Sequence, residues 1–210
     1  MNIARAPATN EKPVFIETPH LYMRTLTEDD ASDRWAAWLD QDEVRAGVNL
    51  GPQRKTKADI VAYVRKFDQQ SRLLLGIFDK SNDFFIGILT AQINWQLGSF
   101  LANTVVGEAA YRNRGVMLEI TPPFRTFFFE TLGLKAVAAS VLATNKAVIG
   151  YIEKTGWTLN QTLKGHAKSH IDGSPIDLLL YSITRDDWNA WMAAHPQELY
   201  AMQHAAAPRT

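Results

Sequence analysis

The chain has 210 residues, of which 46% are hydrophobic and 21% charged, and its 22 Lys and Arg residues balance 22 Asp and Glu residues. This composition is typical of a globular protein, and the zero formal charge argues against a protein that binds nucleic acid or anionic membranes through a charged surface. The absence of cysteine excludes disulfides, thiolate metal sites and a thiol nucleophile. The five histidines are scattered along the chain, so we also expect no metal site.

The first third of the chain predicts one strand and two helices. Residues 1–19 contain no apolar run of signal-peptide length, and no later segment has the length of a membrane span, so we expect a cytoplasmic protein. Leu21–Leu26 alternates weakly and predicts a strand. Thr27, followed by three acidic residues, predicts the N-cap of a helix that ends before Gly47. A second helix is predicted to begin at Thr56.

The middle of the chain predicts antiparallel strands followed by a long helix. The apolar runs Arg72–Phe78 and Phe84–Asn94 are joined by five turn-forming residues, which is typical of a hairpin. A further strand is expected at about Leu101–Ala110. After the segment 111–115, a helix should continue to Gly133, which is free to adopt a positive φ and so to end it.

The last third predicts a strand, a helix and a closing hairpin. Leu134–Leu142 alternates as a buried strand, and Lys146–Lys154 predicts a short helix. Trp157–Leu163 and Pro175–Ile183 predict a hairpin around an Asp-Gly turn. Asp186–Ala194 predicts a closing helix with an apolar side rich in tryptophan.

One segment between a predicted strand and a predicted helix has the pattern of an anion-binding loop. It reads Arg112, Asn113, Arg114, Gly115, Val116 and Met117. A turn containing glycine at the start of a helix exposes backbone N–H groups that have no partner inside the helix, and the helix dipole adds partial positive charge there. Such a terminus binds a pyrophosphate, and the two arginines would add charge-assisted hydrogen bonds. The alternative interpretation is a basic loop at a helix start.

Three motifs occur in the same order as in a known family. They are YRNRGVMLEI from Tyr111, ATNKAVIGYIEKTGW from Ala143, and HIDGSPIDLLLYSITRDDW from His170. In these motifs and their spacing the chain resembles the GNAT superfamily of acyl-CoA-dependent N-acyltransferases. It resembles more narrowly the branch that includes the ribosomal-protein alanine N-acetyltransferases and the spermidine acetyltransferases. The resemblance covers about Leu21 to Trp188.

The resemblance implies an α/β (α+β) protein of GNAT fold. Its sheet would be mixed, mostly antiparallel and flanked by helices, with a V-shaped splay between the central strands. The chain would divide into an N-terminal extension at 1–19, the acyltransferase domain at 20–188, and a C-terminal helix and tail at 189–210. From their composition, we expect the residues up to about Pro19 and those beyond His195 to lie outside the core.

The resemblance also implies where acyl-CoA binds. The backbone from Arg112 to Met117 would hold the pyrophosphate, and Asn145 would hydrogen-bond the pantetheine arm. Unpaired N–H groups near Val105, Val106 and Gly107 would hold the thioester carbonyl and stabilise the negative charge that develops on its oxygen. An amine would attack this carbonyl directly, which agrees with a chain that has no cysteine nucleophile.

Two departures from the family pattern bear on this site. Met117 stands where the family has glycine or alanine, so its side chain either crowds the phosphate or points into the core. Pro122 and Pro123 lie inside the predicted helix, where each removes a hydrogen bond. We expect the helix either to kink or to restart with Thr121 as its N-cap.

The residues that move protons do not follow from the resemblance alone. Ile152 and Val148 stand at the positions of the usual acids, and Tyr151 lies one residue away, so Tyr151 or water is the expected acid. Glu108, beside the coenzyme loop, is the first candidate for the base, and its alternative role is a solvated loop carboxylate. We interpret Glu119 as structural. Weaker candidates for the base are His166, His170 and Asp177.

We therefore expect an N-acetyltransferase that moves an acetyl group from acetyl-CoA to a primary amine without a metal. The acceptor would be a peptide N-terminus, a polyamine or a small-molecule amine. Between Thr27 and Glu43, seven acidic residues stand against one basic residue, which predicts either attraction of a cationic amine or a solvated face. The alternative function is a non-catalytic acyl-CoA-binding regulatory protein. We expect no nucleic-acid or membrane partner and leave a homodimer open.

Overall fold

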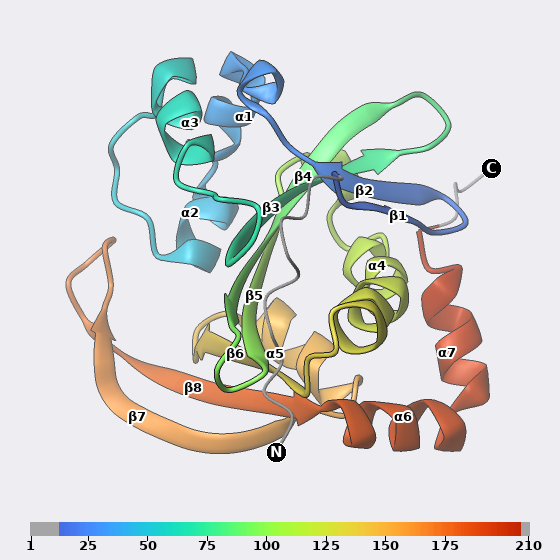
Figure 1. Cartoon of the computed structure of the whole chain (residues 1–210). Helices are drawn as coiled ribbons and strands as arrows, with labels where there is room; N and C mark the ends of the chain where they lie inside the picture. Colours follow the sequence, from blue (N-terminus) through green and yellow to red (C-terminus); the bar gives the residue numbers. More distant parts are fainter. Residues whose placement is uncertain (1–12, 207–210) are drawn as a thin grey trace.

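The computed structural model describes residues 13–206, which form an eight-stranded sheet with helices on both faces (Figure 1). The strand order is β1-β2-β3-β4-β5-β6-β8-β7, and every neighbouring pair is antiparallel except β5 and β6. The strands are β1 (Phe15–Glu17), β2 (Leu21–Thr25), β3 (Arg72–Asp79), β4 (Phe84–Asn94), β5 (Ser99–Val106), β6 (Ala136–Leu142), β7 (Thr158–Lys168) and β8 (Pro175–Thr184). The predicted mixed, mostly antiparallel sheet is confirmed, and β1 is the one strand that the sequence did not predict.

The helices lie in two groups. Figure 1 shows α1, α2 and α3 on one side of β3 to β5, and α4 and α7 on the other. No helix within residues 13–206 is long and apolar enough to cross a membrane. The α-helices are α1 (Asp33–Trp38), α2 (Asp42–Val48), α3 (Lys57–Val64), α4 (Val116–Thr126), α5 (Lys146–Glu153), α6 (Arg185–Ala194) and α7 (Pro196–Gln203). The shorter helical turns are η1 (Glu28–Asp30), η2 (Ala109–Tyr111) and the π-helical η3 (Phe127–Thr131).

The apolar run of β3 is buried on both faces of the sheet. Leu73 and Leu75 pack with Ile120 of α4 in the larger core cluster, and Leu74 packs with Trp35 of α1 in the second cluster. Successive side chains of a strand point to opposite faces, so a strand covered by helices on both sides reads as continuously apolar.

The predicted helix after Thr27 is divided into three pieces. Asp30 accepts a hydrogen bond from the Thr27 N–H at 2.8 Å and pairs with Arg24, and these contacts stop the first turn at η1. Ser32 then caps α1 by accepting from the Trp35 N–H at 3.2 Å. The prediction of one continuous helix was wrong because the backbone is extended at Ser32 and again at Gln41, which separates η1, α1 and α2.

The two prolines do not restart the helix that contains them. Helix α4 runs from Val116 through Pro122 and Pro123 to Thr126 and continues into the π-helical η3. The Thr121 hydroxyl donates to the carbonyl of Met117 at 2.6 Å, as it can from inside a helix. Of the two alternatives, the restart with Thr121 as N-cap was therefore wrong. In η3 the backbone hydrogen bonds change from the α-helical spacing of four residues to the π-helical spacing of five.

Both ends of the described chain contribute to the core. Val14, just before the edge strand β1, and Ile16, within it, are buried, and Met202 of α7 is buried in the same core cluster as residues of α4. The expectation that segments before Pro19 and after His195 lie outside the core was wrong for these residues, because each covers apolar surface next to α4. Residues 1–12 and 207–210 lie outside the described part of the chain.

The carboxylate of Glu119 on α4 joins the two ends of the chain. Its side chain is fully buried. One oxygen accepts from the Thr18 hydroxyl at 2.5 Å and from the His20 N–H at 2.8 Å. The other oxygen lies 3.0 Å from His20 Nδ1 and accepts from the Ala206 N–H at 2.9 Å. These contacts support the structural interpretation of Glu119.

Acid should destabilise the fold partly through Glu119. Burial raises the pKa of this carboxyl, but hydrogen bonds from Thr18, His20 and the Ala206 N–H outweigh burial and hold the pKa below its ordinary value of 4.5. The ionised carboxylate therefore contributes stability that is fully present above about pH 4.5 and is lost as the pH falls through the lower folded pKa. Urea unfolding at a series of pH values measures this dependence, and Glu119→Gln should reduce it. Equal dependence in both proteins would contradict the prediction.

Candidate active site

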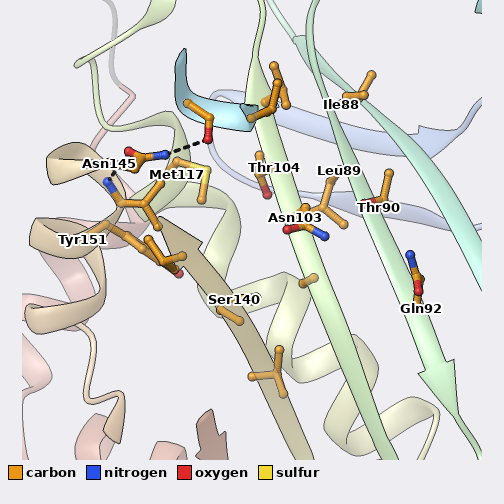
Figure 2. A pocket seen from close by; sticks show the side chains of 18 of the residues that line it. Ile88, Leu89, Thr90, Gln92, Asn103, Thr104, Met117, Ser140, Asn145 and Tyr151 are labelled. Carbon is orange, nitrogen blue, oxygen red and sulfur yellow. Dashed lines mark hydrogen bonds between the residues drawn. The ribbon is translucent and has the colours of Figure 1, made fainter. Parts of the chain in front are cut away.

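Strands β5 and β6 separate after a short parallel pairing. Ser99–Leu101 pairs with Ala136–Ala138, and no pairing between the two strands continues beyond these residues. The two strands diverge from this point, so the predicted V-shaped splay is present. A cavity of about 620 Å³ occupies it and reaches residues of α2, α3, α4 and α5 as well as the strands (Figure 2). We call it the splay cavity.

The edge of β5 that faces the splay has backbone groups without a strand partner. Residues Ala102 to Val106 pair with β4 on one side only. In an antiparallel pair alternate N–H groups point away from the partner, so some of these groups face the cavity. Val105 lines the splay cavity and Val106 lines a second one. The Gly107 N–H instead donates to the carbonyl of Ile86 at 2.9 Å and is not free.

The start of α4 has the geometry of an anion-binding loop. Gly115 is the N-cap residue with a φ of 75°, and its carbonyl accepts from the Glu119 N–H at 2.9 Å. The next N–H groups, from Val116 onward, have no partner within the helix. A second cavity of about 430 Å³, which we call the loop cavity, lies between this turn and α5. Lys146, the first residue of α5, and Lys154, its C-cap, also line it, and they were not predicted from the sequence.

The side chains of the loop have different roles. Arg112 donates from Nε to the carbonyl of Val106 at 3.0 Å and from its Nη atoms to the Gly107 carbonyl and, at 2.8 Å, to Glu43. It therefore ties the end of β5 to α2, and its guanidinium is occupied by these contacts. Arg114 is exposed, and it is absent from the residues that line the loop cavity. Asn113, with a positive φ of 57°, does line it.

Asn145 closes one side of the splay cavity. Its carbonyl oxygen caps α5 by accepting from the Val148 N–H at 3.2 Å, and its Nδ2 donates to the carbonyl of Gly47 at 3.2 Å (Figure 2). Asn49 then donates to the carbonyl of Lys168 at 2.9 Å and so joins the end of α2 to the β7–β8 hairpin. The sequence analysis found Asn145 but not the bridge from α2, because the bridge depends on contacts between residues far apart in the chain.

Tyr151 and Met117 face the cavities. The Tyr151 hydroxyl lies 2.7 Å from the Thr121 hydroxyl, which itself donates to the carbonyl of Met117. Because the Thr121 proton is used in that bond, the Tyr151 hydroxyl is the donor to Thr121. Met117 and Tyr151 line both cavities, as Val148 also does. The Met117 side chain packs against the larger core cluster, as one of its two alternatives has it, and it also borders both cavities.

Glu108 does not reach either cavity. The N–H groups of Gly107 and Glu108 both donate to the carbonyl of Ile86, which turns the chain at the end of β5. The Glu108 carboxylate then accepts from Trp38 Nε1 at 2.8 Å and lies 3.4 Å from the guanidinium of Arg34. The structure therefore does not place Glu108 where a base would contact the amine.

The acidic residues expected to attract a cationic amine lie outside the cavities. None of residues 28–43 lines either cavity. Several pair with basic residues instead, so their negative charge is compensated locally. The pairs are Arg24 with Asp30, Arg45 with Asp42, Arg54 with Asp40, Arg65 with Glu28, and Arg112 with Glu43.

Arg125 is the largest omission of the sequence analysis. It lines the splay cavity from α4 and is only 2% exposed. The sequence did offer one signal, because Arg125 is the single charged residue between two apolar runs, residues 122–124 and 127–129. Polar side chains of β4, β5 and β6 also line the cavity and were not predicted (Figure 2); they are Thr90, Gln92, Asn103, Thr104 and Ser140.

Comparisons with known proteins agree on one family. The family model described as an acetyltransferase (GNAT) domain matches residues 20–158. No curated protein sequence matches the chain significantly.

Several solved structures share the fold at low sequence identity. A GCN5-related N-acetyltransferase from Brucella melitensis has a TM-score of 0.73 and 17% identity over 97% of this chain and 90% of its own. A ribosomal-protein-S5-alanine acetyltransferase from Vibrio fischeri has a TM-score of 0.69 and 16% identity over 83% and 98%. A spermidine N-acetyltransferase from Vibrio cholerae, solved with CoA and spermine, has a TM-score of 0.70 and 16% identity over 81% and 98%.

Proposed function

Because the chain belongs to the acetyltransferase (GNAT) domain family, we propose that it transfers an acyl group from acyl-CoA to a primary amine in the splay between β5 and β6. Acetyl is the simplest such group. One observation carries the proposal: Met117, Val148 and Tyr151 line both cavities. The cavity beside the turn at the start of α4 and the cavity at the open edge of β5 are thus neighbours that share these side chains, and one ligand would follow a path from the first to the second.

The coenzyme would enter along this path. The free N–H groups that follow Gly115 would hold the pyrophosphate, and Lys146 and Lys154 would add positive charge beside it. Arg112 would act indirectly, by fixing the end of β5 against α2. Asn145 would border the pantetheine arm where it passes between α5 and α2. Positioning of the thioester against the amine then accounts for most of the rate.

The chemical step needs only a fixed donor and a proton path. The amine nitrogen attacks the thioester carbonyl, a C–N bond forms, and the C–S bond breaks. The amine loses one proton and the departing sulfur gains one, so the products are an amide and CoA with a free thiol. Free N–H groups of β5 would stabilise the carbonyl oxygen as it becomes negative. The Tyr151 hydroxyl would turn from Thr121 to the departing sulfur and give it the proton, and the proton that the amine loses would restore the hydroxyl.

Replacing Tyr151 with phenylalanine should slow acyl transfer by about 100-fold or more, because a general acid contributes about 10²–10⁴ in rate. The dissociation constant of CoA, measured by calorimetry, should change less than about threefold, since the ring remains. Tyr200→Phe, at an exposed position on α7, serves as the matched control and should keep the wild-type rate. Unchanged transfer in Tyr151→Phe would remove Tyr151 from the mechanism.

The proposed function itself is tested by titrating CoA into the protein. Binding that Gly115→Ala weakens would support the path from α4 to the splay. Absence of CoA binding by the wild-type protein would overturn the proposal.

A further inference from the structure

The charged residues that line the two cavities are all cationic. Lys66, Arg72 and Arg125 line the splay cavity, and Lys146 and Lys154 line the loop cavity. Neither lining contains an aspartate or a glutamate. In the proposed function, the two lysines of the loop cavity would lie beside the phosphates of the coenzyme. The three cations of the splay cavity have no such partner in the proposed function.

Arg125 differs from the other two because it is buried. Lys66 and Arg72 are exposed at the rim beside α3 and β3, whereas Arg125 is 2% exposed. Within residues 13–206 it forms no ion pair. Its Nη1 donates to the Thr155 carbonyl at 3.3 Å, and its Nη2 has no hydrogen-bond partner. A buried charge without a counter-ion is costly, and a buried guanidinium is well suited to a carboxylate.

The guanidinium is held by aromatic rings. Its central carbon lies 4.2 Å from the ring centroid of Trp188 and 5.1 Å from that of Trp157. Burial lowers the pKa of Arg125 and the neighbouring Tyr151 hydroxyl opposes this effect, but an arginine in a protein stays protonated. The rings contact the guanidinium and provide no anion, so the charge remains uncompensated.

Arg125 lies at the far end of the proposed coenzyme path. Met117, Thr121 and Arg125 are spaced four residues apart, so they form one row along α4. Met117 borders both cavities, and Thr121 is bonded to Tyr151. At about 1.5 Å per residue, Arg125 lies roughly 12 Å further along the helix than Met117. A ligand that enters at the coenzyme loop and follows this row reaches Arg125 with its acyl end.

We propose that the splay cavity accepts an acyl donor whose acyl group ends in a carboxylate, and that Arg125 binds this carboxylate. The donor is a CoA monothioester of a dicarboxylic acid. The inference rests on the proposed function and names the substrate class of its donor. The transfer step is unchanged: the C–S bond breaks and a C–N bond forms at the thioester, while the distal carboxylate stays ionised against Arg125.

The test compares pairs of CoA thioesters of equal carbon number by calorimetry. The pairs are malonyl with propionyl, succinyl with butyryl, and glutaryl with valeryl. At one length or more, the carboxylated thioester should bind the wild-type protein at least 10-fold more tightly than its neutral partner. Arg125→Met should bring the difference below about threefold and leave the affinity for free CoA unchanged. Lys66→Met, which removes a cation from the rim, should keep the donor preference.

Three results would overturn the inference: neutral thioesters that bind as tightly at all three lengths, a preference that survives in Arg125→Met, or one that is lost in Lys66→Met. The wild-type comparison does not depend on whether the variants fold. Free CoA separates this inference from the proposed function. If free CoA binds and no pair shows a preference, only the donor class is wrong, whereas failure of free CoA to bind overturns both.

Discussion

Replacing Glu119 with alanine should lower the free energy of unfolding by about 3–5 kcal/mol and the Tm by roughly 10 °C, because the buried donors that converge on this carboxylate lose their acceptor. These donors are the Thr18 hydroxyl, the His20 N–H and the Ala206 N–H. The variant therefore loosens β1 and β2 and the end of α7 from α4 together. Urea unfolding at neutral pH measures the change.

Glu130→Ala is the matched control for this prediction. Glu130 follows α4 in η3 and is exposed, so its loss should change stability by less than about 0.5 kcal/mol. Equal destabilisation by the two substitutions would show that the contacts of Glu119 do not hold the ends of the chain together.

Replacing Gly115 with alanine should weaken CoA binding at least 10-fold. A φ of 75° is unfavourable for a residue with a Cβ, and the added Cβ would lie 2.4 Å from the Ala205 carbonyl oxygen and 2.5 Å from the Ala205 Cβ. Either the turn or the segment just after α7 must shift to relieve this overlap. The N–H groups at the start of α4 would then no longer converge on the pyrophosphate. Calorimetric titration with CoA measures the effect.

Gly133→Ala is the matched control, because it introduces similar backbone strain at a position away from the coenzyme loop. Gly133 has a similar φ of 68°, but nothing lies within 4 Å of its added Cβ, and it lines neither cavity. The control should lose a similar amount of stability from backbone strain and keep the wild-type affinity for CoA. If Gly115→Ala also kept that affinity, the turn at the start of α4 would not be the pyrophosphate site.

The sequence was informative where local chemistry decides the structure. The alternating and continuous apolar runs predicted seven of the strands, and the glycine turn before an apolar helix predicted the loop at Gly115. The motif around Asn145 placed that residue at the start of α5, where it caps the helix. These features depend on residues within a few positions of one another.

The remaining features depend on contacts between distant residues. Arg112 was expected at a phosphate, but Glu43, 69 positions away, holds it against α2. Glu108 was expected as a base, but its carboxylate accepts a hydrogen bond from the indole N–H of Trp38, 70 positions away. The surroundings of Arg125 depend on Trp157, which precedes β7, and on Trp188 of α6, whose rings contact its guanidinium. No local pattern in the sequence specifies such partners.

An assay of CoA release tests most directly whether this chain moves an acyl group from CoA to an amine in the splay. Acetyl-CoA and succinyl-CoA are incubated with the protein and a library of primary amines, and released CoA is followed with a thiol reagent. Because the chain has no cysteine, the reagent reports CoA alone. We expect CoA release that depends on an amine, equals the acylated amine found by mass spectrometry, and falls in Gly115→Ala. Binding of CoA without any amine-dependent release would contradict it and would favour a non-catalytic acyl-CoA-binding protein.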